Sequence, residues 1–99
     1  MEKIKIEELS LAVQGLKALA HPARLSILCF LEDQKATVNK LVEFTGMSQS
    51  AVSQHLSKMK AFGILKDDRD GNQVYYSVTN PEFKKLISAL CCIYTKKSN

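Results

Sequence analysis

The sequence contains no segment long enough to cross a membrane and no export signal. Among its 99 residues there is no run of 18 apolar residues, and the most apolar stretch, residues 25–31, is too short to span a bilayer. The N-terminus also lacks the apolar core and the small-residue cleavage site of a secretory signal peptide. We therefore expect a cytoplasmic protein.

The usual signatures of an enzyme are missing as well. The chain has no glycine-rich phosphate loop, and no local motif joins a cysteine to a histidine and an orienting acid. It also has no internal repeat, low-complexity tract or linker-like segment, while 45% of its residues are hydrophobic. We therefore expect residues 1–99 to fold as a single small domain with no enzymatic activity and no cofactor.

The most informative segment that is present is SQSAVSQHLSK, residues 48–58, which contains no acidic residue. At helical spacing, Val52, Leu56 and Met59 form one apolar stripe. The opposite face carries small polar residues and a lysine, namely Ser50, Ser53, Gln54, Ser57 and Lys58. Serine is a poor helix former, and a solvated face usually carries Glu and Lys instead. With a net charge of +4, this composition favours a helix against a polyanion; an ordinary solvated helix is the alternative.

A second short helix is predicted just before this segment, over residues 38–45. Thr37 is a good N-cap for it, and Gly46 can adopt the left-handed conformation that ends a helix. Ser48 can then cap the following helix. Two short helices joined by a glycine-containing turn predict a helix-turn-helix, in which the second helix reads DNA.

Two strands that form a hairpin are predicted after the second helix. Residues 64–69 and 73–78 flank Asp70 and Gly71, a dipeptide that favours a type I′ turn, and Gly63 ends the preceding helix. A hairpin in this position is a wing. Its tip carries Arg69, Asn72 and Gln73, which suit phosphate or minor-groove contacts. An ordinary hairpin with a polar tip is the alternative.

The two ends of the chain are predicted to be helical and strongly apolar. A stripe near the N-terminus precedes a helix that begins at Pro22 and runs to about Glu32, and Asn80 caps a last helix. The two terminal stripes are Ile6, Leu9, Val13 and Leu16, and Phe83, Leu86, Ile87, Leu90 and Tyr94. This is more apolar surface than a small winged domain readily covers, so we expect a homodimer; burial within one chain is the alternative.

With these elements in place, the chain resembles the ArsR/SmtB family of bacterial winged-helix repressors. The resemblance rests on LKALAHPARLSIL at 16–28, SQSAVSQHL at 48–56, GIL at 63–65 and VYYSV at 74–78. It implies a mainly α fold with a β-hairpin wing: four helices, two strands and a fifth helix. It also implies a homodimer that binds double-stranded DNA at an imperfect inverted repeat and represses transcription until an inducer binds, although some relatives activate genes by countering silencing.

The resemblance also implies where the DNA contacts lie. It assigns them to the second helix of the motif and to the wing between Arg69 and Gln73. On the helix, the implied contacts are Gln49, Ser50, Ser53, Gln54 and Ser57. Lys58 joins them because it lies on the same face, and His55 is a further candidate, although a lone histidine beside an apolar stripe is more often structural.

The two metal sites that are common in this family are absent from the sequence. Residues 38–45 contain no cysteine, and residues 80–99 contain no histidine or aspartate. His21 is expected at a helix junction and does not restore either site. We therefore expect no metal, and the sequence leaves the inducer unidentified.

Three cysteines remain to be explained, Cys29 in the second helix and Cys91 and Cys92 in the last. The arrangement resembles the thiol-sensing, HlyU/BigR-like branch of the family, in which a bridge between two such thiols loosens DNA binding. In that branch a cysteine follows the last tyrosine, where this chain has Thr95. The partner of Cys29 therefore stays open between Cys91 and Cys92. Cys91 borders the apolar stripe, and Cys92 points outward.

Other roles for the cysteines and for the domain stay open at the level of the sequence. The cysteines could simply pack in the core, as cysteine often does. A three-thiolate site for a soft metal or metalloid is a third choice. A winged-helix module that binds another protein is the main alternative function, and it would show no salt-dependent binding to DNA.

Overall fold

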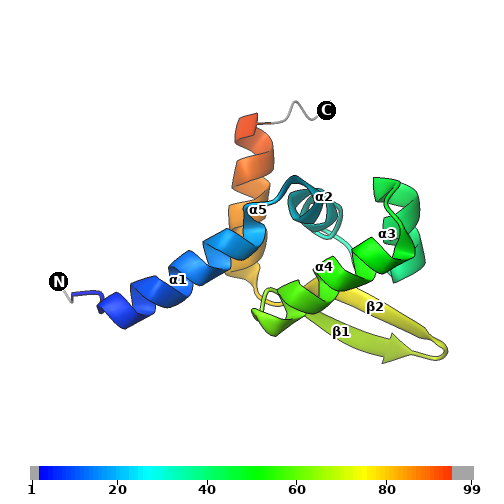
Figure 1. Cartoon of the computed structure of the whole chain (residues 1–99), viewed down its shortest axis with the longest axis horizontal. Coiled ribbons are helices and arrows are strands. Elements are labelled where there is room, and N and C mark those ends of the chain that lie inside the picture. The colour runs from blue at the N-terminus through cyan, green and yellow to red at the C-terminus, as the bar shows by residue number, and fades with distance from the viewer. Residues whose placement is uncertain (1–2, 95–99) are drawn as a thin grey trace.

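Five helices and one β-hairpin make up the computed structural model, which describes residues 3–94. In chain order the elements are α1 (Ile6–Leu19), α2 (Pro22–Phe30), α3 (Val38–Thr45), α4 (Gln49–Ala61), β1 (Leu65–Asp70), β2 (Gln73–Val78) and α5 (Pro81–Tyr94) (Figure 1). This order confirms the predicted mainly α fold with a β-hairpin wing. Helix α2, which was predicted to run from Pro22 to about Glu32, ends at Phe30.

The helix boundaries follow from the capping residues. The hydroxyl of Thr37 accepts a hydrogen bond from the Lys40 amide at 3.2 Å and starts α3. Gly46 ends α3 with a φ of 75°, and the Ser48 hydroxyl accepts from the Ala51 amide at 3.1 Å to start α4. These contacts confirm the predicted helix-turn-helix, because they set the tight turn between its two helices.

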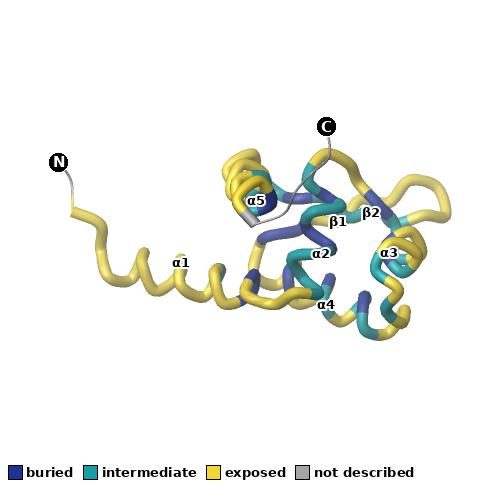
Figure 2. Tube along the Cα trace, turned by 90° about the horizontal axis from the view of Figure 1, so that it is seen from above, coloured by how far each residue is buried: buried dark blue, intermediate teal, exposed yellow. Residues whose placement is uncertain are grey.

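One apolar core lies between α2, α3, α4, the hairpin and α5 (Figure 2). Its largest fully buried side chains are Ile27, Leu28, Leu31, Leu41, Leu56, Met59, Ile64, Leu65, Ile87 and Val52. The predicted stripe of α4 is confirmed, because its three members are all in this set. Burial of this stripe fixes which face of α4 points outward.

The wing is an antiparallel hairpin in which Leu65 pairs with Val78 and Asp70 pairs with Gln73. The type I′ turn predicted at Asp70 and Gly71 is wrong. Because β1 continues through Asp70, the two central residues of the turn are Gly71 and Asn72. Of these two residues only Gly71 has a positive φ, at 64°, which is the φ pattern of a type II′ turn. Glycine suits this place because it adopts positive φ as readily as negative φ, whereas residues with a Cβ do so only at a cost in backbone strain.

The loop between α2 and α3 is joined to the wing by backbone hydrogen bonds. The Ala36 amide donates to the Tyr76 carbonyl at 3.1 Å, and the Tyr76 amide donates to the Ala36 carbonyl at 2.8 Å. The Lys35 ammonium lies 4.7 Å from the centre of the Tyr75 ring. The wing is therefore attached to the body of the domain beside α3 as well as through its own strands.

Helix α1 extends away from the rest of the domain (Figures 1 and 2). Only Ala18 and Leu19, at its C-terminal end, are buried. The predicted N-terminal stripe is exposed, with Ile6 at 76% and Leu16 at 55% exposure. Burial of this stripe within one chain is therefore wrong. Within residues 3–94, none of the helices combines the length and the apolar character needed to cross a membrane.

The apolar stripe of α5 is divided between the core and the solvent. Ile87 is buried and Phe83 packs against the core, whereas Leu86 is exposed, as is Ile93, which lies outside the predicted stripe. Leu90 is intermediate, and the predicted role of the Tyr94 side chain lies outside what the structure describes. Between α1, the end of α4 and α5 is an apolar groove of about 560 Å³, whose lining includes Leu11, Leu16, Phe62 and Leu86.

Candidate nucleic-acid interface

The outward face of α4 gathers most of the side chains that the sequence singled out. Gln49, Ser50, Gln54, Ser57 and Lys58 are exposed, and Ser53 is half-buried at the edge. The face carries hydrogen-bond donors and acceptors, a lysine and no carboxylate. Since the opposite face of α4 is buried in the core, these polar groups point away from the core. The arrangement suits contact with phosphates and base edges.

The hairpin places a second exposed polar group at its tip. Arg69, Asn72 and Gln73 are all exposed and lie in or beside the two-residue turn. Aspartates at positions 67, 68 and 70 share β1 with Arg69, a feature that the sequence reasoning did not weigh. Their charge opposes approach of a phosphate along the strand, and Asp70, which pairs with Gln73 beside the turn, brings one carboxylate next to the tip.

One of these aspartates is neutralised by a contact that links the wing to α4. The Lys60 ammonium donates to Asp67 Oδ2 at 2.8 Å. This hydrogen bond holds the pKa of Asp67 below its usual value and raises the pKa of Lys60. The pair joins the end of α4 to β1. Sequence reasoning missed it because the two residues belong to different elements.

His55 lies on the flank of α4 and is held by α2. Its Nδ1 accepts a hydrogen bond from the Arg24 Nε at 3.2 Å, and its ring centre lies 4.9 Å from that of His21. Burial lowers the pKa of His55, and the charges of His21, Arg24 and Lys58 lower it further. His21 in turn caps α2, because its Nδ1 accepts from the Ala23 amide at 3.1 Å.

Both histidines therefore have a structural partner, and His21 lies at a helix junction as predicted. Arg24 is a further residue whose role could not be predicted from the sequence. No local pattern could have found it, since it lies 31 positions before His55 and its role depends on how α2 crosses α4.

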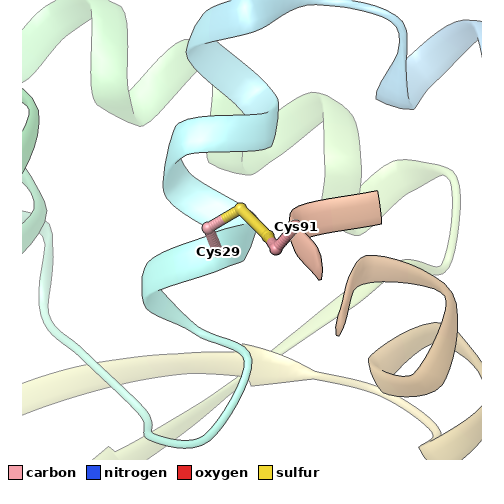
Figure 3. Close-up of a disulfide and its surroundings, with 2 residues drawn as sticks. All are labelled: Cys29 and Cys91. Atoms are coloured by element: carbon pink, nitrogen blue, oxygen red, sulfur yellow. A yellow bond between two sulfur atoms is a disulfide. The ribbon is translucent and has the colours of Figure 1, made fainter. Parts of the chain in front are cut away.

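Cys29 of α2 and Cys91 of α5 are joined by a disulfide (Figure 3). Their Cα atoms are 6.9 Å apart, close to the upper limit for such a bridge. Cys91 is buried, whereas Cys92 is exposed and is a free thiol. Of the two partners left open by the sequence, the structure selects Cys91. Thr95 lies outside the described residues.

These features together define a winged helix-turn-helix protein of the DNA-binding class. The second helix of the motif presents a polar face without acids, a hairpin follows it directly, and the core holds both elements in place.

The comparisons with known proteins agree with this class. The family described as "Bacterial regulatory protein, arsR family" matches residues 21–67, from the N-cap of α2 into β1. The transcriptional repressor PagR of Bacillus anthracis is 42% identical over 89 residues, which cover 87% of this chain and 89% of the relative. The regulator YgaV of Escherichia coli K12 is 40% identical over 80 residues, covering 80% of this chain and 81% of the relative.

A solved structure has the same fold. Reduced HlyU from Vibrio cholerae superposes with a TM-score of 0.85 at 34% identity, covering 91% of this chain and 95% of that one. The chain belongs to the ArsR family of bacterial regulatory proteins and is a DNA-binding transcriptional regulator. Members of this family are typically dimeric, and the relatives named here are regulators rather than enzymes.

Proposed function

We propose that this protein is a cytoplasmic repressor that binds an imperfect inverted repeat in DNA as a homodimer. The observation that carries the proposal is the outward face of α4, which is polar, free of acids and adjacent to a wing. The relatives support repression, because PagR is named as a transcriptional repressor.

The exposed face of α1 supports the dimer. A contiguous apolar face on a helix that projects from its own domain is typical of a protein interface. In the proposed dimer, this face and the apolar groove beside it meet the same surfaces of a second copy. The two α4 helices then enter successive major grooves, about 34 Å apart, which is why the operator is expected to be an inverted repeat.

We assign base contacts and phosphate contacts to different residues of the interface. Gln54, with its amide at the middle of the outward face, reads bases, and the small side chains around it bond to base edges or phosphates: Gln49, Ser50, Ser53 and Ser57. Lys58 contacts phosphate, and Arg69, Asn72 and Gln73 meet the backbone or the minor groove from the wing. We assign His55 to holding α4, since its Nδ1 is engaged by Arg24.

We further propose that Cys29 and Cys91 switch DNA binding. Disulfides are rare in cytosolic proteins, and those that occur are usually catalytic or redox-sensing. Cys29 is half-buried and Cys91 is buried, so a peroxide would reach Cys29 first. Its thiolate takes one oxygen to become a sulfenic acid with loss of hydroxide. The Cys91 thiolate then attacks that sulfur and expels a second hydroxide, completing a two-electron oxidation.

The consequence for DNA follows from where the bridge lies. It connects α2 to α5, and α2 also packs on the helix-turn-helix and bonds α4 through Arg24. Closing or opening the bridge therefore biases the position of the recognition helix. We expect the reduced protein to bind tightly and the oxidised protein to bind weakly.

The test is fluorescence anisotropy with a duplex taken from upstream of the gene that encodes this chain. The protein is assayed fully reduced and then after treatment with peroxide or polysulfide, beside Cys29→Ser and the matched control Cys92→Ser. Tight binding that weakens on treatment in wild type and Cys92→Ser, but not in Cys29→Ser, supports the switch. Binding that ignores treatment leaves a repressor whose cysteines only pack, and absence of binding in both states would favour a protein-binding module.

A further inference from the structure

A single guanidinium group connects three helices in this domain. Arg24 belongs to α2. Its Nη1 donates to the carbonyl of Ala18, at the end of α1, at 3.1 Å, and its Nε donates to His55 on α4 at 3.2 Å. Both hydrogen bonds are part-buried, which makes them costly to leave unmade.

The two helices that Arg24 joins have different tasks. The outer part of α1 carries the exposed apolar face, and its last residues, Ala18 and Leu19, are anchored in the core. Helix α4 presents the polar face to DNA. In a dimer built on α1, the orientation of α4 relative to the end of α1 decides whether both recognition helices reach successive major grooves at once.

We propose that Arg24 is a positioning residue for DNA recognition, holding α4 in register with the end of α1 without itself contacting DNA. The proposal deepens the proposed function and rests on it. Since the planar fork of arginine donates in two fixed directions, lysine cannot replace it, although lysine preserves the charge.

The link depends on the protonation state of His55. Nδ1 accepts from Arg24 only when it carries no proton, so protonation replaces an acceptor by a second donor. The groups that face His55 are His21, from the segment before α2, Arg24 on α2 and Lys58 on α4 itself. All of them are cationic or can become so, and with burial they keep the imidazole neutral at neutral pH by lowering its pKa.

A direct phosphate contact by Arg24 is the competing role, and the dependence of binding on salt separates the two. Each phosphate contact contributes about 0.9 to the slope of log affinity against log salt. A positioning residue contributes to affinity without contributing to that slope. Arg24→Lys keeps the positive charge but removes the planar fork. A loss of discrimination between duplexes in this variant therefore reports lost positioning.

The experiment measures anisotropy with the upstream duplex and with a shuffled duplex of the same composition, over a series of salt concentrations. For Arg24→Lys we expect the affinity ratio between the two duplexes to fall about tenfold or more, with an unchanged salt slope. Lys58→Gln is the matched control and is expected to lower the slope by about 1. Arg24→Lys with a wild-type ratio, or with a reduced slope, overturns the proposal.

Circular dichroism shows whether Arg24→Lys stays folded. If it does not, a second measurement tests the proposal through His55. The ratio between duplexes is measured from about pH 7.5 down to the lowest pH at which the domain stays folded, since added positive charge strengthens binding to both duplexes and largely cancels in the ratio. We expect the wild-type ratio to fall in acid and that of His55→Gln, whose amide oxygen still accepts from Arg24, to stay level. A level wild-type ratio overturns the proposal. A wild type that does not discriminate between the duplexes overturns the proposed function and this inference with it.

Discussion

At the scale of single residues, neighbouring side chains of the proposed interface differ in the DNA groups that they can contact. Gln54 and Lys58 are one helical turn apart on α4 and are both exposed. The amide of Gln54 offers a donor and an acceptor in fixed geometry, which can distinguish one base edge from another. The ammonium of Lys58 is a point charge and responds to phosphate without regard to sequence.

This difference gives the first prediction. Gln54→Ala is expected to lower discrimination between the operator and a single-base variant by about 1–3 kcal/mol, whereas Lys58→Ala is expected to weaken binding to every duplex alike. Anisotropy titrations against a set of single-base variants measure both effects. If Gln54→Ala keeps full discrimination, base readout by Gln54 is wrong.

The second prediction concerns His55 and stability. Its pKa in the folded chain is lowered from 6.5, so below that value the unfolded chain binds protons more readily than the folded one. Acid therefore favours unfolding, and this part of the stability is present above pH 6.5 and lost as the pH falls through the lowered pKa.

We expect Tm to decrease as the pH is lowered from about 7 to about 5, and the decrease to be smaller in His55→Gln. Asp67, the other group whose lowered pKa acts in this direction, titrates below its usual 3.8 and lies outside this window. Differential scanning calorimetry at several pH values measures the change. Equal slopes of Tm against pH in the two proteins would exclude His55 as the source.

At the scale of secondary-structure elements, local chemistry accounts for much of what the sequence predicted. Caps such as Ser48 and Gly46, and the buried stripe of α4, depend on residues within a few positions of one another. The turn of the wing was misplaced by one residue because Asp70 and Gly71 are both good turn residues, and only the pairing of Asp70 with Gln73 decides between the two registers.

Contacts between elements could not be predicted in the same way. Lys60 with Asp67, and Arg24 with His55, depend on how helices and strands pack, which no short pattern encodes. The cysteine pair is an intermediate case. Helical periodicity already placed Cys91 nearer the apolar stripe than Cys92, but the choice of partner for Cys29 required the packing of α2 against α5.

The third prediction belongs to the wing. Gly71 has a φ of 64°, and a Cβ at that position would meet no atom within 4 Å. Gly71→Ala is therefore expected to cost about 1–2 kcal/mol through backbone strain alone, without a steric clash. Urea denaturation of Gly71→Ala measures the cost, beside the control Gly15→Ala, which is expected to be stabilising because alanine is the better helix former inside α1. A Gly71→Ala variant that is as stable as the wild type would contradict the assigned turn.

At the scale of the whole molecule, the chain has two unequal surfaces. One is the polar face formed by α4 and the wing, and the other is the apolar face along α1 with the neighbouring groove. In the proposed dimer, each copy binds one half of the proposed inverted repeat through its polar face. Under that proposal, affinity for the full site depends on the apolar face, because that face recruits the second copy.

The fourth prediction tests this dependence. Leu9→Glu and Leu16→Glu together place two carboxylates on the exposed stripe of α1 and are expected to convert a dimer to a monomer. Analytical ultracentrifugation measures the mass, and circular dichroism checks that the domain stays folded. The replacement of Lys3 and Lys5 by glutamine, outside the stripe, lowers the net charge by the same two units and is the matched control for charge. A dimer that survives the leucine substitutions would place the interface elsewhere.

The bridge between Cys29 and Cys91 has a topological consequence. It spans 62 positions, so α3, α4 and both strands lie inside one covalent ring, while α1 lies outside it. By loop-closure entropy, such a ring removes about 4 kcal/mol of conformational freedom from the unfolded chain. A protease that cuts once within the wing would leave the oxidised chain in one piece, whereas a cut in α1 would release a fragment. A non-reducing gel of a partial digest would therefore report the redox state of the protein directly.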